Sequence, residues 1–276
     1  MPSHAVSCKT CGKTFFVDQN RFVRTQHFFC SQPCYALWER EGFTGHNHST
    51  FRRMMNLGFP SEFQKQIIFG TLLGDASLSK PRTGINYHLS VYHSLAQKEY
   101  CLEKFSLLKP FSSKIQYCDY LDKRNTKHYF GVRFHTFSHP FFTAIYPLFY
   151  QDGKKIAPLE ISKLANEVAL AFLIGDDGNI HRNTIYIATC SFTLDCVNRL
   201  LEWIKHFGVE AWITSADYLR IAISSKSLPV IQKLTQAYLP KTMHYKIGGV
   251  QHKESARRDL ALPENRVQET TQFLCA

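Results

Sequence analysis

The chain has 276 residues, 44% of them hydrophobic, which is enough to bury the core of one large domain or of two to three small ones and excludes a disordered chain. Lysine and arginine outnumber aspartate and glutamate by 33 to 22, and the resulting net charge of +11 favours a polyanionic partner. Since no apolar run approaches the ~20 residues that span a bilayer, and the N-terminus lacks the apolar segment of a signal peptide, we expect an intracellular protein without a membrane partner.

Four cysteines near the N-terminus have the spacing of a zinc site. Cys8 and Cys11 are separated by two residues, Cys30 and Cys34 by three, and the two pairs by 18. We expect residues 1–43 to form a treble-clef or ribbon-like zinc finger, because so short a segment has little core and metal supplies its folding energy. The alternative is four thiols without metal. Basic residues would give the finger a surface for DNA or for a protein, and the sequence does not decide between them: Lys9, Lys13, Arg21 and Arg24.

A polar linker is predicted at residues 44–60, and a helix then begins at the N-cap Ser61 and runs to Gly74. Two glycines, Gly70 and Gly74, lie on one stripe of this helix. Each costs about 1 kcal/mol in a helix interior. We therefore expect another helix to approach the backbone closely along this stripe.

Two successive segments have the same order of predicted elements, αββαββα. In the first, alternation of apolar and polar residues predicts strands at Ile85–His93, Lys114–Tyr120 and Phe130–Thr136. Helical periodicity predicts helices at Ala96–Leu108 and near Pro140–Tyr150. In the second, the elements are a helix at Leu164–Gly175, a hairpin at Ile180–Thr189 that turns at Arg182 and Asn183, a helix at Leu194–Phe207, strands at Glu210–Thr214 and Tyr218–Ser224, and a helix at Leu228–Tyr238. The repeat indicates a duplicated half-domain.

Each half begins with an apolar helix that ends in a carboxylate. Asp75 and Asp177 occupy equivalent places 102 residues apart. A carboxylate at the negative end of a helix dipole is unfavourable, and two that emerge side by side repel unless a divalent metal lies near them. Carboxylates and carbonyls suit Mg²⁺, whose usual setting beside phosphates is phosphodiester hydrolysis. The alternative is that both acids are ordinary turn residues.

The segments Ile68–Ala76 and Leu170–Gly178 resemble the paired motifs of single-chain LAGLIDADG homing endonucleases. The resemblance covers residues 61–250 and is supported by Asp152–Pro158, Thr189–Thr193 and His244–Ile247. It implies an α+β fold of two pseudo-symmetric αββαββα half-domains with saddle-like antiparallel sheets, at 61–151 and 152–250, beside the small zinc-binding domain.

The resemblance also implies the site residues. Asp75 and Asp177 bind the catalytic Mg²⁺, with Gly74 and Asp176 counted at the same site, and Lys155 and Lys246 lie nearby as catalytic lysines. The halves are not identical. Gly70 corresponds to the bulky Phe172, Asp176 has no acidic counterpart, and Ala76 stands where the family usually has glycine.

One face of an antiparallel sheet is free to read DNA. From the alternation and the hairpin tips we expect this surface to carry Lys80, Arg82, Asn86, His88, Ser90, Tyr92, Lys114, Gln116, Arg133, His135, Arg182, Thr184, Tyr186, Tyr218 and Arg220. Since the two halves carry different side chains, an asymmetric target is expected.

The expected protein is a monomeric, site-specific endonuclease of intron homing that cuts both strands of long double-stranded DNA, with Mg²⁺ as catalytic and Zn²⁺ as structural ion. Three alternatives stay open: a non-cleaving DNA-binding regulator, an RNA-binding intron maturase, and a zinc-dependent interaction protein whose large domain is only a scaffold. The basic residues after Gly249 form an expected tail at 251–276. The other cysteines (Cys101, Cys118, Cys190, Cys196 and Cys275) are expected to be structural.

Overall fold

The computed structural model describes residues 3–25, 27–31, 34–35, 57–82, 84–122, 124, 126–215 and 219–249. The chain divides into two compact units, residues 1–58 and 59–276. The expected tail at 251–276 and residues 44–56 of the expected linker lie outside the described residues.

The smaller unit contains an antiparallel hairpin of β1 (Ser3–Ser7) and β2 (Thr14–Asp18), followed by α1 (Gln19–Arg24). Asp18 ends the strand and caps the helix, because its carboxylate accepts the backbone N–H of Arg21 at 2.8 Å. The tight turn between the strands passes through Gly12, whose φ of 73° favours glycine. This turn carries the first two cysteines.

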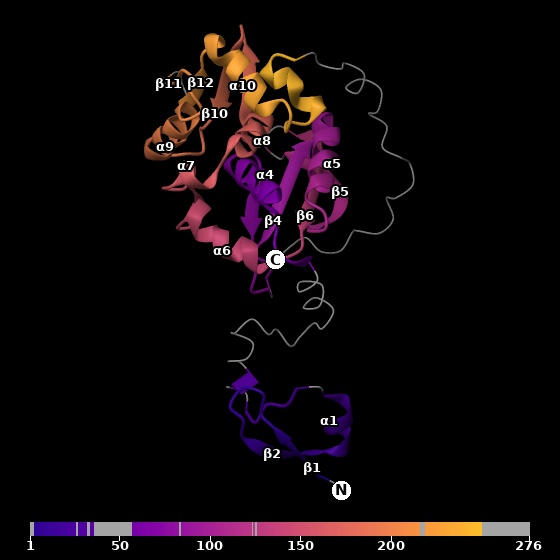
Figure 1. Cartoon of the computed structure of the whole chain (residues 1–276). Helices are drawn as coiled ribbons and strands as arrows, with labels where there is room; N and C mark the ends of the chain where they lie inside the picture. The colour runs from indigo at the N-terminus through magenta and orange to yellow at the C-terminus, as the bar shows by residue number, and fades with distance from the viewer. Residues whose placement is uncertain are drawn as a thin grey trace. The chain divides into compact units, whose positions relative to one another are not determined.

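The larger unit contains the duplicated half-domain (Figure 1). Its first half is built from α4 (Glu62–Leu73), β3 (Ser77–Ser79), β4 (His88–Ser94), η1 (Leu95–Gln97), α5 (Lys98–Leu107), β5 (Ser112–Asp122), β6 (Lys127–Thr136) and α6 (Pro140–Phe149). A short hairpin and helix follow, namely β7 (Tyr150–Gln151), β8 (Lys154–Lys155) and α7 (Ile161–Leu164). The second half is built from α8 (Glu167–Asp177), β9 (Gly178–His181), β10 (Thr184–Ala188), α9 (Leu194–Lys205), β11 (Ala211–Ser215), β12 (Leu219–Ile223), η2 (Ser225–Ser227), α10 (Leu228–Thr235) and η3 (Lys241–Ile247).

The two sheets have the same topology. Their strand orders are β3-β4-β6-β5 and β9-β10-β12-β11, and every pairing is antiparallel. Each half therefore has the predicted order of elements, and the strands are connected in the same way in both, which confirms the duplication and the α+β fold class.

Helices α4 and α8 pack against each other at the centre of the larger unit (Figure 1). A Cβ atom at Gly70 would collide with the backbone carbonyl of Ala169, so the absence of a side chain allows this close approach. The buried carboxamide of Gln66 joins the same two segments, since it donates to Leu164 O at 3.0 Å and accepts from Asn166 N at 2.9 Å. The predicted helix contact is confirmed.

The caps determine where the paired helices begin. Ser61 and Gln64 form a capping box at the start of α4, and the side chain of Asn166 accepts the N–H of Val168 at the start of α8. The second helix differs from the prediction: it begins at Glu167 and continues through Asp177, while Ile161–Leu164 forms the separate α7. None of the helices in the described ranges is long and apolar enough to cross a membrane.

Two details of the first sheet also differ from prediction. The short strand β3 was not predicted, and the strand expected to begin at Ile85 begins at His88. Asn86 precedes the strand, and its carboxamide oxygen accepts the hydroxyl of Thr143 in α6 at 2.9 Å. The expectation that Asn86 lies on the open sheet face was therefore wrong, because a hydrogen bond to a neighbouring helix directs this side chain away from the strand alternation.

Candidate functional site

The two predicted acids lie where the ends of α4 and α8 meet. Asp75 follows the C-cap of α4, and Asp177 is the last residue of α8. The backbone N–H of Asp75 donates to Oδ2 of Asp176 at 3.1 Å, which links the two helix ends directly. The structure thus brings together the acids that the sequence pairs.

Burial and mutual repulsion make both carboxylates harder to ionise. Burial first, and then the charges of Asp75 and Asp176, raise the pKa of Asp177 to about 7 against the opposing effect of Lys155 and Lys246. The pKa of Asp75 is also raised, first by burial and then by Asp176. A divalent cation between or beside these groups would stabilise their ionised forms.

Each helix end is capped by one lysine, half-buried at Lys155 and buried at Lys246. Lys155, on β8, donates to Gly74 O at 2.7 Å and to Ala76 O at 2.8 Å. Lys246, on η3, donates to Gly175 O at 2.6 Å and to Asp176 O at 2.7 Å. The two lysines occupy equivalent places, where they neutralise the negative end of a helix. Burial lowers the pKa of each ammonium, and the neighbouring aspartates oppose that effect.

Asp176 has a different environment from the other two acids. Its side chain is fully buried and pairs with Lys104 of α5, and its carboxylate also accepts the hydroxyl of Tyr100 at 2.8 Å. Its bulk fills the space that a side chain at Gly74 would need, which explains why the first motif has no equivalent acid. Sequence reasoning missed Lys104. The available signal was its position four residues after Tyr100 on the buried face of α5.

The oxygen atoms at this junction suit a hard cation such as Mg²⁺. Asp75, with a side chain 39% exposed, and Asp177 offer their carboxylates. Asp75, His93 and Asp176 place one possible ligand atom each within 4.8 Å of one another. However, the Asp176 carboxylate already accepts hydrogen bonds from Lys104, Tyr100 and the backbone N–H of Asp75, so it is less available to a cation than the carboxylates of Asp75 and Asp177.

The open face of the first sheet carries most of the predicted polar side chains. Register places Ser90 opposite His135 and Tyr92 opposite Arg133, while Leu89 and Val91 face the core. Arg133 Nε donates to Gln116 Oε1 at 2.9 Å across the neighbouring strand. Lys114 is exposed on the same edge strand, and His88 meets His135 edge to face.

The second sheet presents a smaller polar face. Register and burial place Thr184, Tyr186 and Arg220 on the face opposite Ile185, Ile187 and Ile221, as predicted. Sequence reasoning missed four residues of this face, namely Asn179, His181, Trp212 and Thr214. Outside the strands, three predicted basic residues are exposed, namely Lys80, Arg82 and Arg182, and Tyr218 lies outside the described residues.

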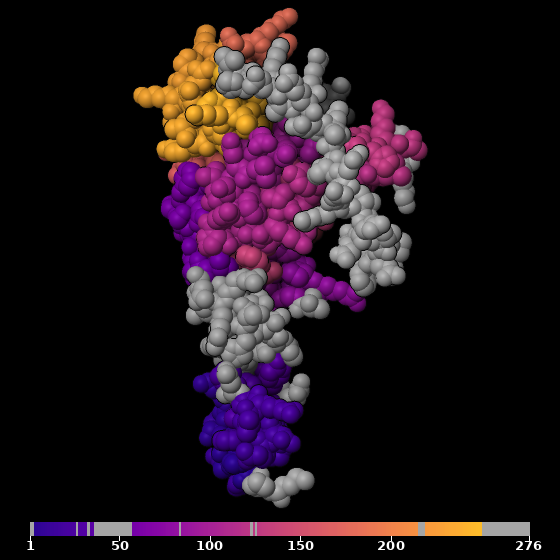
Figure 2. Space-filling model, turned by 90° about the vertical axis from the view of Figure 1, so that its right-hand side faces the viewer, coloured from indigo at the N-terminus to yellow at the C-terminus, as the bar shows by residue number. Residues whose placement is uncertain are grey.

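Strands β5 and β6 continue past the sheet as a two-stranded arm. Pairing between β5 and β6 extends to Asp122 opposite Lys127, whereas pairing between the equivalent strands β11 and β12 ends at Ser215 opposite Leu219. The arm projects from the larger unit at the right of Figure 2. It exposes Tyr120 and Tyr129, side by side on the same face as Arg133, and these aromatic residues were also missed. The first half thus has the longer polar and aromatic surface.

The four predicted zinc ligands of the smaller unit lie together. Their sulfur atoms are all within 4.8 Å of one another, and Sγ of Cys30 lies 3.5 Å from Sγ of Cys11 and 3.6 Å from that of Cys34. Four thiolates about 2.3 Å from a tetrahedral zinc would have such spacing. The pKa of Cys8 falls to about 6, because backbone N–H groups of Cys11, Cys30 and Thr10 outweigh the opposing effect of burial. The cluster therefore fits the geometry and chemistry of a zinc ion.

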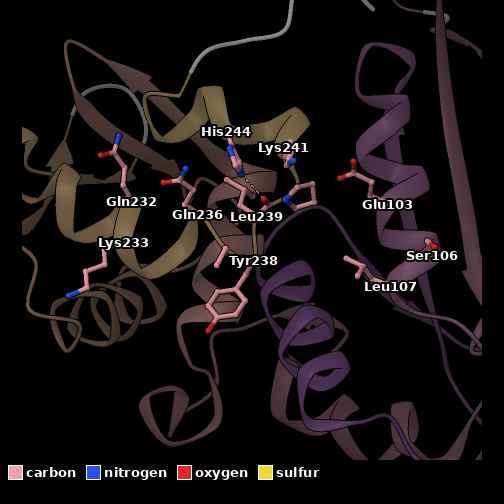
Figure 3. A pocket seen from close by; sticks show the side chains of 12 residues that line it. Glu103, Ser106, Leu107, Gln232, Lys233, Gln236, Tyr238, Leu239, Lys241 and His244 are labelled. Atoms are coloured by element: carbon pink, nitrogen blue, oxygen red, sulfur yellow. Dashed lines mark hydrogen bonds between the residues drawn. The ribbon is translucent and has the colours of Figure 1, made fainter.

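A separate pocket of about 830 Å³ opens between α5 and the segment from α10 to η3 (Figure 3). Glu103 and Leu107 lie on one side of it, and Gln236 and Lys241 on the other. His244 Nε2 lies 2.9 Å from Leu239 O at its rim. The pocket lining contains none of the three aspartates Asp75, Asp176 and Asp177 and neither capping lysine, so the pocket is not part of the carboxylate site.

Comparison with known proteins adds a family and relatives. Residues 65–240 match the family described as "LAGLIDADG DNA endonuclease family". The chain is 28% identical to cytochrome b mRNA maturase bI2 of Debaryomyces hansenii over 66% of this chain and 72% of that protein. It is 25% identical to DNA endonuclease I-ChuI of Chlamydomonas applanata over 67% and 94%, respectively. The structure of the homing endonuclease I-WcaI bound to its DNA recognition sequence has a similar fold, with a TM-score of 0.68, 19% identity, and coverage of 76% of this chain and 96% of that one.

Proposed function

This chain belongs to the LAGLIDADG DNA endonuclease family, and we propose that it is a homing endonuclease that makes a double-strand break in a long, asymmetric DNA target by Mg²⁺-dependent hydrolysis. The observation that carries the proposal is the pair of partly buried carboxylates, Asp75 and Asp177, at the joined ends of α4 and α8. Each has a raised pKa, and each helix end has a capping lysine.

In this proposal Asp75 and Asp177 each hold divalent metal for cleavage of one strand. When bound, Mg²⁺ supplies a nucleophilic water at neutral pH and stabilises charge on the leaving 3′ oxygen. Lys155 and Lys246 keep the helix ends and the acids in place through the carbonyl groups they bind, and their charges favour the approach of a phosphate. Gly74 and Asp176 contribute at most their backbone carbonyls to the metal.

The two open sheet faces are proposed to read the DNA in the major groove. Arg133 with Gln116 is the best-defined pair, because its hydrogen bond fixes the guanidinium in a position to reach a base edge. The two faces differ in length and in side chains, which supports an asymmetric target. Both halves belong to one chain, so the proposed active form is a monomer.

An RNA maturase is the second candidate, because two relatives are mRNA maturases. Retention of Asp75 and Asp177 supports cleavage over a purely binding role. Duplexes selected for binding in Ca²⁺ and then transferred to Mg²⁺ test the proposal. We expect a subset to be cut in both strands at one position. If all bound duplexes stay intact while intron RNA is bound and its splicing accelerated, the endonuclease proposal is wrong and the maturase proposal replaces it.

We further propose that the smaller unit holds one structural zinc ion. Replacement of Cys8 by serine should reduce bound zinc from one ion per chain to a small fraction and unfold the β1–β2 hairpin and α1, because the metal supplies most of the folding energy of so small a unit. Metal analysis and the amide NMR spectrum measure both effects. Cys190→Ser, at an exposed cysteine of the larger unit, is the matched control. A folded smaller unit without zinc would contradict the proposal.

Metal binding should depend on pH because Asp177 must lose its proton to bind a cation. Its pKa of about 7 lies above that of an ordinary aspartate, so the protonated form dominates below pH 7 and metal must displace a proton there. Affinity for Mn²⁺, read from the EPR signal of the free ion, is therefore expected to rise between pH 6 and 8, with a loss of roughly tenfold per pH unit below 7. Asp177→Asn should weaken binding and flatten this dependence. An equally steep profile in the variant would assign the proton to another group.

A further inference from the structure

His93 is a buried histidine in the first half that none of the roles above uses. It occupies the last inward-facing position of β4, and its side chain is completely buried. Its Nε2 atom lies 3.2 Å from Nζ of Lys104, and its Nδ1 atom lies 3.5 Å from Oδ2 of Asp75. The imidazole therefore stands between a buried lysine and one of the two proposed metal-binding acids.

The contact with Lys104 determines which ring nitrogen carries the hydrogen. An ammonium group has only donors, so Nε2 of the neutral imidazole must accept and Nδ1 must carry the hydrogen. A ring whose Nε2 accepts from this ammonium carries hydrogen on Nδ1 alone, so the imidazole is the neutral tautomer. The Nδ1–H group is thus directed at the Asp75 carboxylate.

This Nδ1 atom is a buried donor without a hydrogen bond of ordinary length among the described residues. The Nδ1–Oδ2 separation from Asp75 is 3.5 Å, and contacts of this kind are often long in a free protein and tighten in its complex. Lys104 cannot move away to release the ring, since it pairs with Asp176, also fully buried. A continuous chain of contacts therefore runs from Asp176 of the second half through Lys104 and His93 to Asp75 of the first.

The second half lacks this arrangement. The inward positions of β10 are Ile185 and Ile187, and the next equivalent position is Thr189, where the first half has His93. The Thr189 hydroxyl donates its hydrogen to Leu219 O at 2.7 Å, within the same sheet, so it does not donate to Asp177. No hydrogen bond reaches the Asp177 carboxylate from any residue in the described ranges. The two acids thus differ in how they are oriented.

We propose that His93, held in its Nδ1–H form by Lys104, is a positioning residue for Asp75, and that only the first of the two active centres has such a residue. The inference rests on the proposed endonuclease function. A donor bound to one carboxylate oxygen fixes the rotation of the carboxylate and leaves the other oxygen for metal. The cleavage rates of the two DNA strands should consequently depend unequally on His93.

The test compares the rates at which the two strands are cut, with a different fluorescent label on each. His93→Phe keeps a buried ring but removes both nitrogens, and it should change the ratio of the two strand rates by about tenfold or more, the usual effect of losing such a supporting contact. Partial unfolding lowers both rates equally and leaves the ratio unchanged. His93→Asn restores a donor near the position of Nδ1 and should recover part of the ratio.

Thr189→Val is the matched control in the second half and should leave the ratio unchanged. Equal slowing of both strands in His93→Phe, or a ratio that stays at the wild-type value, would overturn the proposal while the endonuclease function stands. If the wild-type protein cuts neither strand, the proposed function itself fails. A second readout does not need cleavage: the ring ¹⁵N shifts of His93 should show hydrogen on Nδ1, and hydrogen on Nε2 would contradict the argument.

Discussion

Asp75→Asn and Asp177→Asn should each abolish double-strand cleavage while binding to the target DNA is retained. Asparagine keeps the size of the side chain but removes the charge that holds a divalent ion. Loss of about 4 kcal/mol of transition-state stabilisation corresponds to about 10³-fold in the rate for the strand that the acid serves. The other strand should still be cut, so nicked duplex is expected to accumulate in place of double-strand breaks.

Binding should be equal or slightly tighter in both variants, because each removes a negative charge from a surface that faces phosphates. Gel shift in Ca²⁺ measures binding, and strand-labelled cleavage in Mg²⁺ measures activity. Asp195→Asn is the matched control, since this exposed acid of α9 pairs with Arg199, one turn away on the same helix. If binding were lost together with cleavage, the two acids would be structural rather than catalytic.

Lys104→Met should cost more stability than any substitution at the protein surface. The change leaves the Asp176 carboxylate fully buried without its cation. Breaking a buried ion pair from one side typically costs about 3–5 kcal/mol, because the remaining charge is neither hydrated nor paired. Urea unfolding followed by far-ultraviolet circular dichroism measures this loss of stability.

The double variant Lys104→Met with Asp176→Asn isolates the buried charge as the cause. The uncharged carboxamide that replaces the Asp176 carboxylate can still accept the Tyr100 hydroxyl, so most of the lost stability should return. Lys98→Met, on the same helix, is the control: its ammonium lies 5.9 Å from the Tyr117 ring centre, and its loss should cost less than about 1 kcal/mol. A double variant no more stable than Lys104→Met would place the defect in packing instead.

The sequence predicted the features that depend on local pattern. Each segment shows strand alternation or helical periodicity in its own residues, so the αββαββα order could be inferred from the sequence. The same pattern occurs twice, so the pairing of Asp75 with Asp177 could be inferred as well. The hairpin turn at Arg182 and Asn183 is another such case. Both residues have positive φ, as a two-residue hairpin turn requires.

Features that depend on contacts between distant segments were not predictable in this way. Asp176 was grouped with the metal ligands because it adjoins Asp177, but its partner Lys104 lies 72 residues earlier in the chain. Asn86 was placed on the sheet face because alternation extends through it, and only the contact with Thr143 shows otherwise. The long arm of β5 and β6 depends on pairing between strands, which no single segment reveals.

The most direct test of the central claim is to locate bound metal in the protein–DNA complex. Crystals of the full chain with its selected target and Mn²⁺ should give anomalous difference peaks beside the carboxylates of both Asp75 and Asp177, next to the phosphates that are cut. Strong peaks elsewhere in the larger unit, with none at these two acids, would contradict the assignment of the paired helix ends as the two active centres.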